Sequence, residues 1–361
     1  MAVARPTAFR GTGLGHDAVG RAFRLPPLAL AITLLALGAV GLFSAVSGAA
    51  GLPAGGVLSA LTNWVPGVES TLTSRQESIL FQIRLPRTVL GMLVGGALGM
   101  AGASYQGVFR NPLADPYLLG VSAGAGFGAS LALGFGFDIG WGPFDPVAAA
   151  AFLGALLAVA ASALIARGAG TSPATLLLGG IAMAALFSAS QTYVLTRLNE
   201  TRAREVLNWL FGQLNTTGWD QVAILAPYLV VCGGVLILHR RHLDVMRVGD
   251  DEARSLGLDP ARSRLVIIVS ASLLTAAAVS VSGLIAFVGL VVPHLVRALA
   301  NHSYRVVVPL SALAGGAFLA FVDVGARTLV EPSELPVGVI TAFVGAPFFA
   351  FVLWRGGRSL A

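Results

Sequence analysis

Few side chains in this chain are of the types that carry chemistry, and each candidate lies at the edge of an apolar run. The carboxylates nearest to such runs are Asp115, Asp220 and Asp323. A lone carboxylate inside a membrane span would indicate ion or proton coupling, but positions at the ends of the runs favour helix capping or pairing with arginine. His294 could ligate a metal ion, although one histidine without partner ligands favours a structural role. We therefore predict no catalytic site and no metal site.

The sequence also argues against ATP hydrolysis by this chain. The phosphate-binding loop G-x-x-x-x-G-K-[ST] needs a lysine, and all 23 basic residues here are arginine. We expect no cofactor in the chain itself. If transport is driven by ATP, a separate ATPase must hold the ATP and the Mg²⁺.

The composition is that of an all-α integral membrane protein. Hydrophobic residues make up 56% of the 361 residues and charged residues only 11%, whereas a soluble domain carries about a quarter charged residues. Apolar runs close to membrane length predict about ten transmembrane helices. The eighth run is short and contains Gly289 and Pro293, which predicts a broken or re-entrant helix. The runs are Pro27–Ala50, Thr88–Gln106, Pro116–Gly134, Pro146–Ala166, Pro173–Leu195, Gln221–Leu238, Leu265–Val281, Leu284–Val296, Val306–Gly325 and Pro336–Trp354.

The arginines predict the orientation, because cytoplasmic links carry an excess of basic residues. With the N-terminus inside, the inner links hold sixteen arginines and the outer links seven. This favours an N-in, C-in topology with an even number of spans. The sequence pI near 10.4 is explained by these links, so we expect no nucleic-acid partner. The first run is too long for a signal peptide, so we expect it to be a retained span.

The inner link between the second and third runs contains the motif RNPLADP. Asn111 and Pro112 are predicted to end one helix, since proline lacks an N–H and disfavours helix in the residue before it. Asp115 is a good N-cap and Pro116 suits a first helical position, so together they are predicted to begin the next helix. The motif therefore predicts a tight turn at the inner membrane surface.

The longest inner link, residues 239–264, is the most charged part of the chain. The acidic residues 250–252 are predicted to begin a short helix, because they suit the positive end of its dipole. Ala253, Leu256 and Leu258 give this helix an apolar side, and the glycine after Leu256 ends it. The segment is either a solvated loop that sets topology or a coupling helix that fits a groove on an ATPase.

Three arginines at the outer side need an explanation, because the charge rule disfavours that side. They are Arg84, Arg87 and Arg327, the last lying four residues after Asp323. One interpretation is that their side chains reach the lipid headgroups or that Arg327 pairs with Asp323 along one helix. The other is a binding surface for an external partner.

Several motifs together resemble the FecCD-type permeases, the membrane subunits of ABC importers for ferric siderophores, heme and cobalamin. The resemblance covers nearly all of the chain from about Ile83 onward. The motifs are IRLPRTVLGMLVGGALGMAGASYQGVFRNPLADPYLLGVSAGAGFG from Ile83, LNWLFGQL from Leu207, GDDEARSLGLDPARSR from Gly249, SGLIAFVGLVVPHLVR from Ser282 and ELPVGVITAFVGAPFFAFVLWR from Glu334.

The resemblance implies a type II ABC importer permease in the cytoplasmic (inner) membrane. It implies one ten-helix domain over residues 27–356 with its coupling loop at 239–264, and cytoplasmic tails at 1–26 and 357–361. It also implies a homodimer with the pathway along the dimer axis, two ATP-binding subunits and an extracytoplasmic substrate-binding protein. We find no function for residues 1–26 beyond their charge.

The resemblance further implies roles for three sets of residues. The three outer arginines, 84, 87 and 327, match positions that dock acidic residues of the binding protein. The ATPase contact is expected at Glu252, Ala253, Arg254, Ser255, Leu256 and Gly257. A cytoplasmic gate is expected at Ser172, Pro173 and Ala174, although an ordinary short turn explains these residues equally well.

The expected cargo is a bulky iron complex, either heme or a ferric siderophore. Cobalamin is the alternative within the same family. A less favoured alternative is a secondary transporter coupled to an ion gradient, which would need a functional buried carboxylate and no ATPase.

Overall fold

The computed structural model describes residues 25–357 except 49, 66, 68, 137–144, 171, 215–217 and 331–332. Within these residues every regular element is helical. Seven helices are long and apolar enough to cross a membrane, and three shorter apolar helices complete the ten predicted runs. The ten are α2 (Pro27–Val46), α5 (Leu85–Val108), α6 (Val121–Phe135), α7 (Pro146–Ala169), α8 (Pro173–Arg197), α10 (Asp220–Met246), α12 (Pro260–Ser282), α13 (Val288–Leu299), α14 (Tyr304–Thr328) and α15 (Val337–Gly357).

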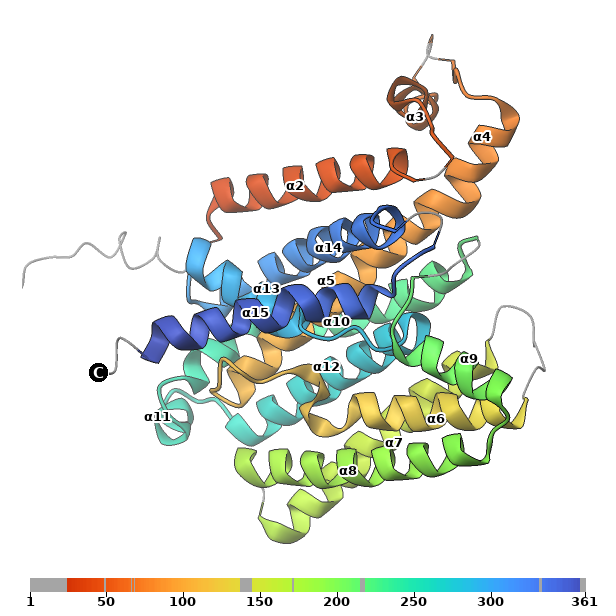
Figure 1. Ribbon diagram of the computed structural model, residues 1–361. Helices are drawn as coiled ribbons and strands as arrows, with labels where there is room; N and C mark the ends of the chain where they lie inside the picture. Colours follow the sequence, from red (N-terminus) through yellow and green to blue (C-terminus); the bar gives the residue numbers. More distant parts are fainter. Residues whose placement is uncertain are drawn as a thin grey trace, which may run out of the picture.

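Short helices mark the two ends of this bundle. One end carries α11 (Asp250–Ser255), the start of α2 and the end of α15, while the opposite end carries α3 (Ala54–Leu61), α4 (Ser74–Ile79) and α9 (Glu200–Leu210) (Figure 1). The first span thus begins and the last span ends at the same side as α11, as the predicted N-in, C-in topology requires, and in that topology the α11 end is the inner end. Residues 1–24 and 358–361, which hold nearly all of the two predicted tails, lie outside the described residues.

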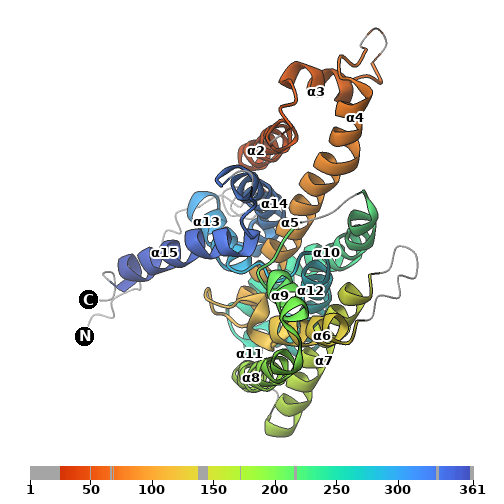
Figure 2. The same cartoon turned by 45° about the vertical axis from the view of Figure 1, so that its right-hand side comes forward.

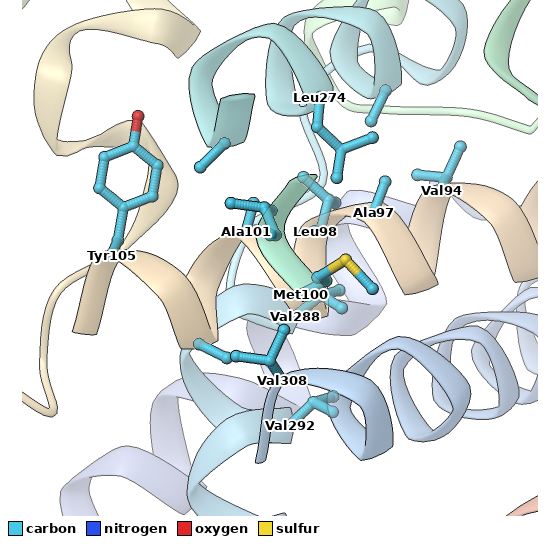
Figure 3. Close-up of a cluster of buried hydrophobic side chains, with 14 of the residues drawn as sticks. Val94, Ala97, Leu98, Met100, Ala101, Tyr105, Leu274, Val288, Val292 and Val308 are labelled. Carbon is cyan, nitrogen blue, oxygen red and sulfur yellow. The ribbon is translucent and has the colours of Figure 1, made fainter. Parts of the chain in front are cut away.

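Helix α5 lies at the centre of the bundle in both views (Figures 1 and 2). In the continuous helical segment Ser74–Val108, 83% of an apolar stretch of 18 residues is buried inside the protein, whereas the corresponding share is 11% in α2 and in α8. Figure 3 shows side chains of α5 between those of α12 on one side and of α13 and α14 on the other. The central helix is thus positioned by its neighbours, and the outer helices present apolar faces to the membrane.

Small residues let α5 and α14 approach closely. A Cβ at Gly95 would overlap the backbone of Gly315, and a Cβ at Gly99 would overlap the carbonyl of Ser311. Such contacts are typical of membrane helices whose backbones touch. Gly91, Gly95 and Gly99 recur every four residues, which places them on one face of α5 and predicts such close packing; the contacts of Gly95 and Gly99 confirm it.

We expect Gly95→Ala to destabilise the protein by about 1–3 kcal/mol, because the added methyl group forces α5 and α14 apart. Gly38→Ala is the matched control, since Gly38 lies on the exposed face of α2 and nothing lies within 4 Å of the position of its Cβ. The control should be neutral or more stable by up to about 1 kcal/mol. Thermal unfolding of both variants in the same detergent tests this, and equal shifts would contradict it.

Several helix boundaries differ from the predicted runs: α10 continues past Leu238 to Met246, and α12 begins at Pro260 rather than at Leu265. The second span begins well before Thr88, because α4 and the π-helical turn η1 (Leu80–Arg84) continue directly into α5. The third span begins later than Pro116: a 3₁₀ turn, η2 (Pro116–Leu119), comes first, and Gly120 at φ 80° then separates it from α6. The polar residues of α4 keep it out of the apolar run that predicts the second span. The left-handed Gly120 explains why α6 begins after Pro116.

Candidate functional site

The three predicted outer arginines lie in one buried cluster. Arg84 is 5% exposed and its guanidinium donates to the carbonyls of Ala45 at 2.9 Å, Val46 at 2.6 Å and Gly48 at 3.2 Å. Ala45 and Val46 are the last two residues of α2 and Gly48 follows it, where the end of a helix leaves carbonyl acceptors unpaired. Arg84 therefore fastens α2 to the start of α5.

Arg87 and Arg327 share one carboxylate, that of Asp323, which is 1% exposed. Arg87 donates to it from Nε at 3.0 Å and Nη2 at 2.9 Å, and Arg327 Nε lies 3.0 Å from its Oδ2. Arg87 also donates to Glu334 at 2.8 Å, and Arg327 donates to the hydroxyl of Ser44 at 2.9 Å. The cluster joins α2, α5 and α14 with buried, charge-assisted hydrogen bonds.

These contacts bear on the interpretations of the arginines. The i,i+4 pair of Asp323 and Arg327 is confirmed. Docking of a binding protein by Arg84, Arg87 and Arg327 stays a prediction, and all three guanidinium groups have partners within the chain. Asp323 is a buried carboxylate, but it is held by two arginines. Sequence reasoning missed Ser44 and Glu334, for which no local pattern gives a signal.

The inner turn has the predicted caps. Asp115 Oδ1 accepts from Tyr117 N at 2.9 Å, and Asn111 Oδ1 accepts from Leu113 N at 2.9 Å. Helix α5 ends at Val108, slightly before the predicted stop, because Arg110 adopts a left-handed conformation with φ 48°. This reversal turns the Arg110 side chain to the coupling loop, where it pairs with Asp250.

Helix α11 lies at the predicted coupling position and is anchored through Asp250. The Asp250 carboxylate accepts from Arg264 of α12 at 2.7 Å and from Arg110. Gly257 ends the helix with φ 80°, as predicted. The predicted apolar side is divided: Ala253 is fully buried against the protein body, whereas Leu256 is 71% exposed. Leu256 is consequently a free apolar contact point on a fixed helix.

The two arginines also control the protonation of Asp250. The hydrogen bond from Arg264, together with the charges of Arg264 and Arg110 and the hydrogen bond from Arg110, lowers the pKa of the Asp250 carboxyl and outweighs the opposing effect of burial. A carboxyl with a lowered pKa in the folded state stabilises the fold above its unfolded pKa, and this stabilisation is lost as the pH falls through the lowered value.

We therefore expect wild type to be more stable than Asp250→Asn at pH 7, by at most about 1 kcal/mol because the pair is partly exposed to solvent. The difference should disappear as the pH is lowered below the usual range of aspartate. Thermal unfolding of the two proteins between pH 7 and pH 3 measures it. A difference that is constant with pH would show that Asp250 acts by shape alone.

The predicted gate is a capped turn at the inner end of α8. The Ser172 hydroxyl accepts from Thr175 N at 3.1 Å, and Pro173 occupies the first helical position. Ser172 and Ala174 are exposed and Pro173 is half-buried. The structure thus describes an N-cap, and the gating role stays a prediction.

The eighth run is not broken at Gly289 or Pro293, because both lie inside the continuous helix α13; the non-helical stretch comes before it, at residues 283–287 between α12 and α13. Tyr117 holds it, donating its hydroxyl to Ile285 O at 2.9 Å and accepting from Ile285 N at 3.2 Å. Gln106 donates to Gly289 O at 3.1 Å. Non-helical backbone at membrane depth needs such partners. Sequence reasoning missed Tyr117 and Gln106, because their partners are more than 160 residues away.

No group of three or more His, Cys, Asp or Glu side chains within the described ranges is arranged to hold a metal ion. The arrangement is suited to transmitting movement along the bundle. It consists of an outer charged cluster, the central helix α5 packed through glycines, and the inner helix α11 fixed by ion pairs.

Comparison with known proteins assigns this arrangement to a family. The model of the FecCD transport family matches residues 34–355. The chain belongs to the FecCD transport family. It is a multi-pass protein of the inner membrane, with the permease architecture of ABC importers.

Individual relatives cover most of the chain. It is 44% identical over 277 residues to a cobalamin import permease of Halobacterium salinarum, covering 76% of this chain and 73% of that protein. It is 36% identical over 347 residues to the ferric enterobactin permease of Escherichia coli, covering 96% and 99%. A solved structure of an inward-facing transporter of the metal-chelate ABC type superposes with a TM-score of 0.79 at 29% identity, covering 91% of this chain and all of that one.

Proposed function

We propose that this chain is the membrane subunit of an ATP-driven importer for a bulky metal chelate, working as a homodimer with two ATPase subunits and an external binding protein. The observation that carries the proposal is α11, an anchored helix that presents an exposed leucine at the inner end. Family membership supports the same assignment. In this proposal the ATP and Mg²⁺ lie on the partner ATPase, and the chain itself catalyses no reaction.

The contacts of α11 suggest how ATP-driven movement reaches the spans. A force on Leu256 is passed through α11 to Asp250, and from Asp250 to Arg264 and Arg110. Arg264 lies on α12, and Arg110 lies between α5 and the inner turn. Movement of the ATPases would therefore tilt α12 and the inner end of α5 together.

The outer charged cluster holds the helices together at the end of the bundle opposite to α11. It joins the outer ends of α2, α5 and α14 through buried charged groups, and separating these helices would leave buried charges without their partners. In the proposal these helices move as one unit, and the binding protein rests on that unit. The predicted gate turn at Ser172–Ala174 then narrows or widens the pathway as α8 tilts.

The cargo we propose is an iron complex, heme or a ferric siderophore, supported by the 36% identity to the ferric enterobactin permease over 96% of the chain. Cobalamin is the second candidate, because the relative of Halobacterium salinarum at 44% identity is a cobalamin permease. All of these are large metal chelates, so the same pathway chemistry serves each.

The test is reconstitution. The tagged chain is isolated from its own membranes in mild detergent together with its co-purifying ATPase, and the complex is placed in proteoliposomes. Uptake is then measured with binding protein loaded with heme, a ferric siderophore or cobalamin. We expect ATP-dependent uptake of one of these. A chain that purifies without any ATPase in several detergents and transports on an ion gradient alone would overturn the proposal.

A further inference from the structure

A cavity of about 490 Å³ lies at the inner end of the bundle, beside the turn at Ser172 and the Arg264 side chain that anchors α11. Its walls come from α7, α8 and α12, with the end of α5 as its floor. The walls are mostly apolar, including Leu156, Val159, Leu176 and Ile268. This volume is within the range of about 300–1,000 Å³ found for small-molecule pockets.

Two arginines line one end of this cavity. Arg167 is in the last turn of α7 and Arg264 is in the second turn of α12. The ends of α7 and α8 that meet here lie on the same side of the molecule as α11, which is the inner side (Figure 1). The start of α8 adds the partial positive charge of a helix N-terminus beside Ser172. The inner end of the cavity is therefore cationic, and the rest is apolar.

The cavity has the depth of one membrane leaflet. From Arg167 to Leu156 the lining follows α7 for eleven residues, which is about 16 Å at about 1.5 Å per residue. Half of the hydrocarbon thickness of a bilayer is about 15 Å. The cavity thus extends from the inner headgroup region to about the middle of the membrane.

The flank around the cavity is exposed and apolar. On α7 Leu157 is 63% exposed and Leu164 66%, and on α12 Leu265 is 55% exposed. In a membrane such side chains contact lipid. A second copy of the chain would bring another strongly basic inner face to the two arginines, because sixteen of the 23 arginines are assigned to inner links. Charge complementarity therefore favours an anionic lipid as the occupant.

The arginines have unused hydrogen-bond donors. Arg264 gives Nη2 to Asp250, but its Nε is buried and has no acceptor among the described residues. Arg167 is exposed and has no acceptor within the part of the chain that the structure describes. A phosphate carries several acceptor oxygens, and guanidinium groups bind phosphate with directed hydrogen bonds.

We propose that this cavity binds an anionic phospholipid of the inner leaflet, with an acyl chain between α7 and α12 and the phosphate at Arg167 and Arg264. The lipid would lie beside the turn at Ser172 and would share Arg264 with the Asp250 anchor of α11. Binding of the lipid would thereby affect both the predicted gate turn at Ser172 and the coupling helix α11. This inference depends on the membrane placement of the chain and not on the identity of the cargo.

The experiment is native mass spectrometry of the full chain in detergent, titrated with dioleoyl phosphatidylglycerol or with dioleoyl phosphatidylcholine. We expect wild type to bind one phosphatidylglycerol per chain more tightly than phosphatidylcholine. Arg167→Gln should weaken phosphatidylglycerol binding about fivefold, as expected for one arginine at a membrane surface, and leave phosphatidylcholine unchanged. Arg197→Gln, at the outer end of α8, is the control and should bind as wild type.

A second pair of variants tests the cavity itself. Ala163→Phe fills it and should reduce the binding of both lipids, whereas Leu157→Phe, on the same helix but outside the lining, should change neither. Equal binding of the two lipids by wild type, or unchanged phosphatidylglycerol binding in Arg167→Gln, would overturn the proposal. Cross-linking of two Leu157→Cys chains in a Cys232→Ser background would also overturn it, because a second copy would then cover this flank.

Discussion

Replacing Asp323 by alanine is expected to lower the unfolding free energy by about 3–5 kcal/mol, the usual cost of leaving buried charges without their partner. Asp323 is 1% exposed and is the carboxylate shared by Arg87 and Arg327. Its removal leaves Arg327 with neutral acceptors only, namely Ser44, the carbonyl of Ser47 and its own helix. Denaturant or thermal unfolding in detergent, followed by tryptophan fluorescence, measures the loss.

Glu334→Gln is the matched control for this prediction. Glu334 binds the same Arg87, but its side chain is 45% exposed, so its loss should cost less than about 1 kcal/mol. Similar losses in both variants would show that burial of the Asp323 pair does not secure the outer cluster. Asp323→Asn separates the functional alternatives: an ATP-driven importer should keep its ATP-dependent uptake in folded variant protein, whereas an ion-coupled transporter should lose its gradient-driven uptake.

The second large effect is expected at the coupling helix. Leu256→Asp should reduce ATP-driven transport at least tenfold, because it places a charge where the exposed apolar side chain is proposed to enter a groove of the ATPase. Loss of about 1.4 kcal/mol of contact corresponds to a tenfold weaker interaction. The fold should be unaffected, since Leu256 is 71% exposed. Uptake into proteoliposomes and co-purification of the ATPase are the two readouts.

Arg262→Gln provides the control near the same helix. Arg262 is exposed at the start of α12, outside the expected ATPase contact at residues 252–257, so its change removes a charge without adding one to the apolar contact point. We expect it to keep most of the transport activity. Normal assembly and normal transport by Leu256→Asp would contradict the coupling role of α11.

The sequence predicts the spans well because hydrocarbon burial is a local property of each run. Each of the ten apolar runs contains a helix in the structure; the short eighth run corresponds to α13, which follows a non-helical stretch and is not broken at Gly289 or Pro293. Caps are also local, which is why Asp115 and Gly257 have the predicted conformations.

The pairings between distant residues could not be predicted in this way. Arg87 is 236 residues from Asp323, and Arg110 is 140 residues from Asp250. Which arginine meets which carboxylate is decided by how the helices pack, and no local spacing records it. The apolar side predicted for α11 was wrong for the same reason: Ala253 and Leu256 face different surroundings once the helix rests on the bundle.

The central position of α5 has a consequence for the synthesis of this protein. The segment that contains it has the lowest mean hydropathy of the seven long apolar helices in the described residues, and it carries Arg84 and Arg87. Each arginine is costly for insertion into a bilayer, by up to about 3 kcal/mol at the centre of a span. Its partner helix α14 begins only at Tyr304, so on the order of 10–40 s of translation separates the two at about 5–20 residues per second. Helix α5 is therefore inserted before Asp323 of α14, the carboxylate that pairs with Arg87, has been synthesised. Until then, contacts with the insertion machinery or with the earlier helix α2 have to stabilise it.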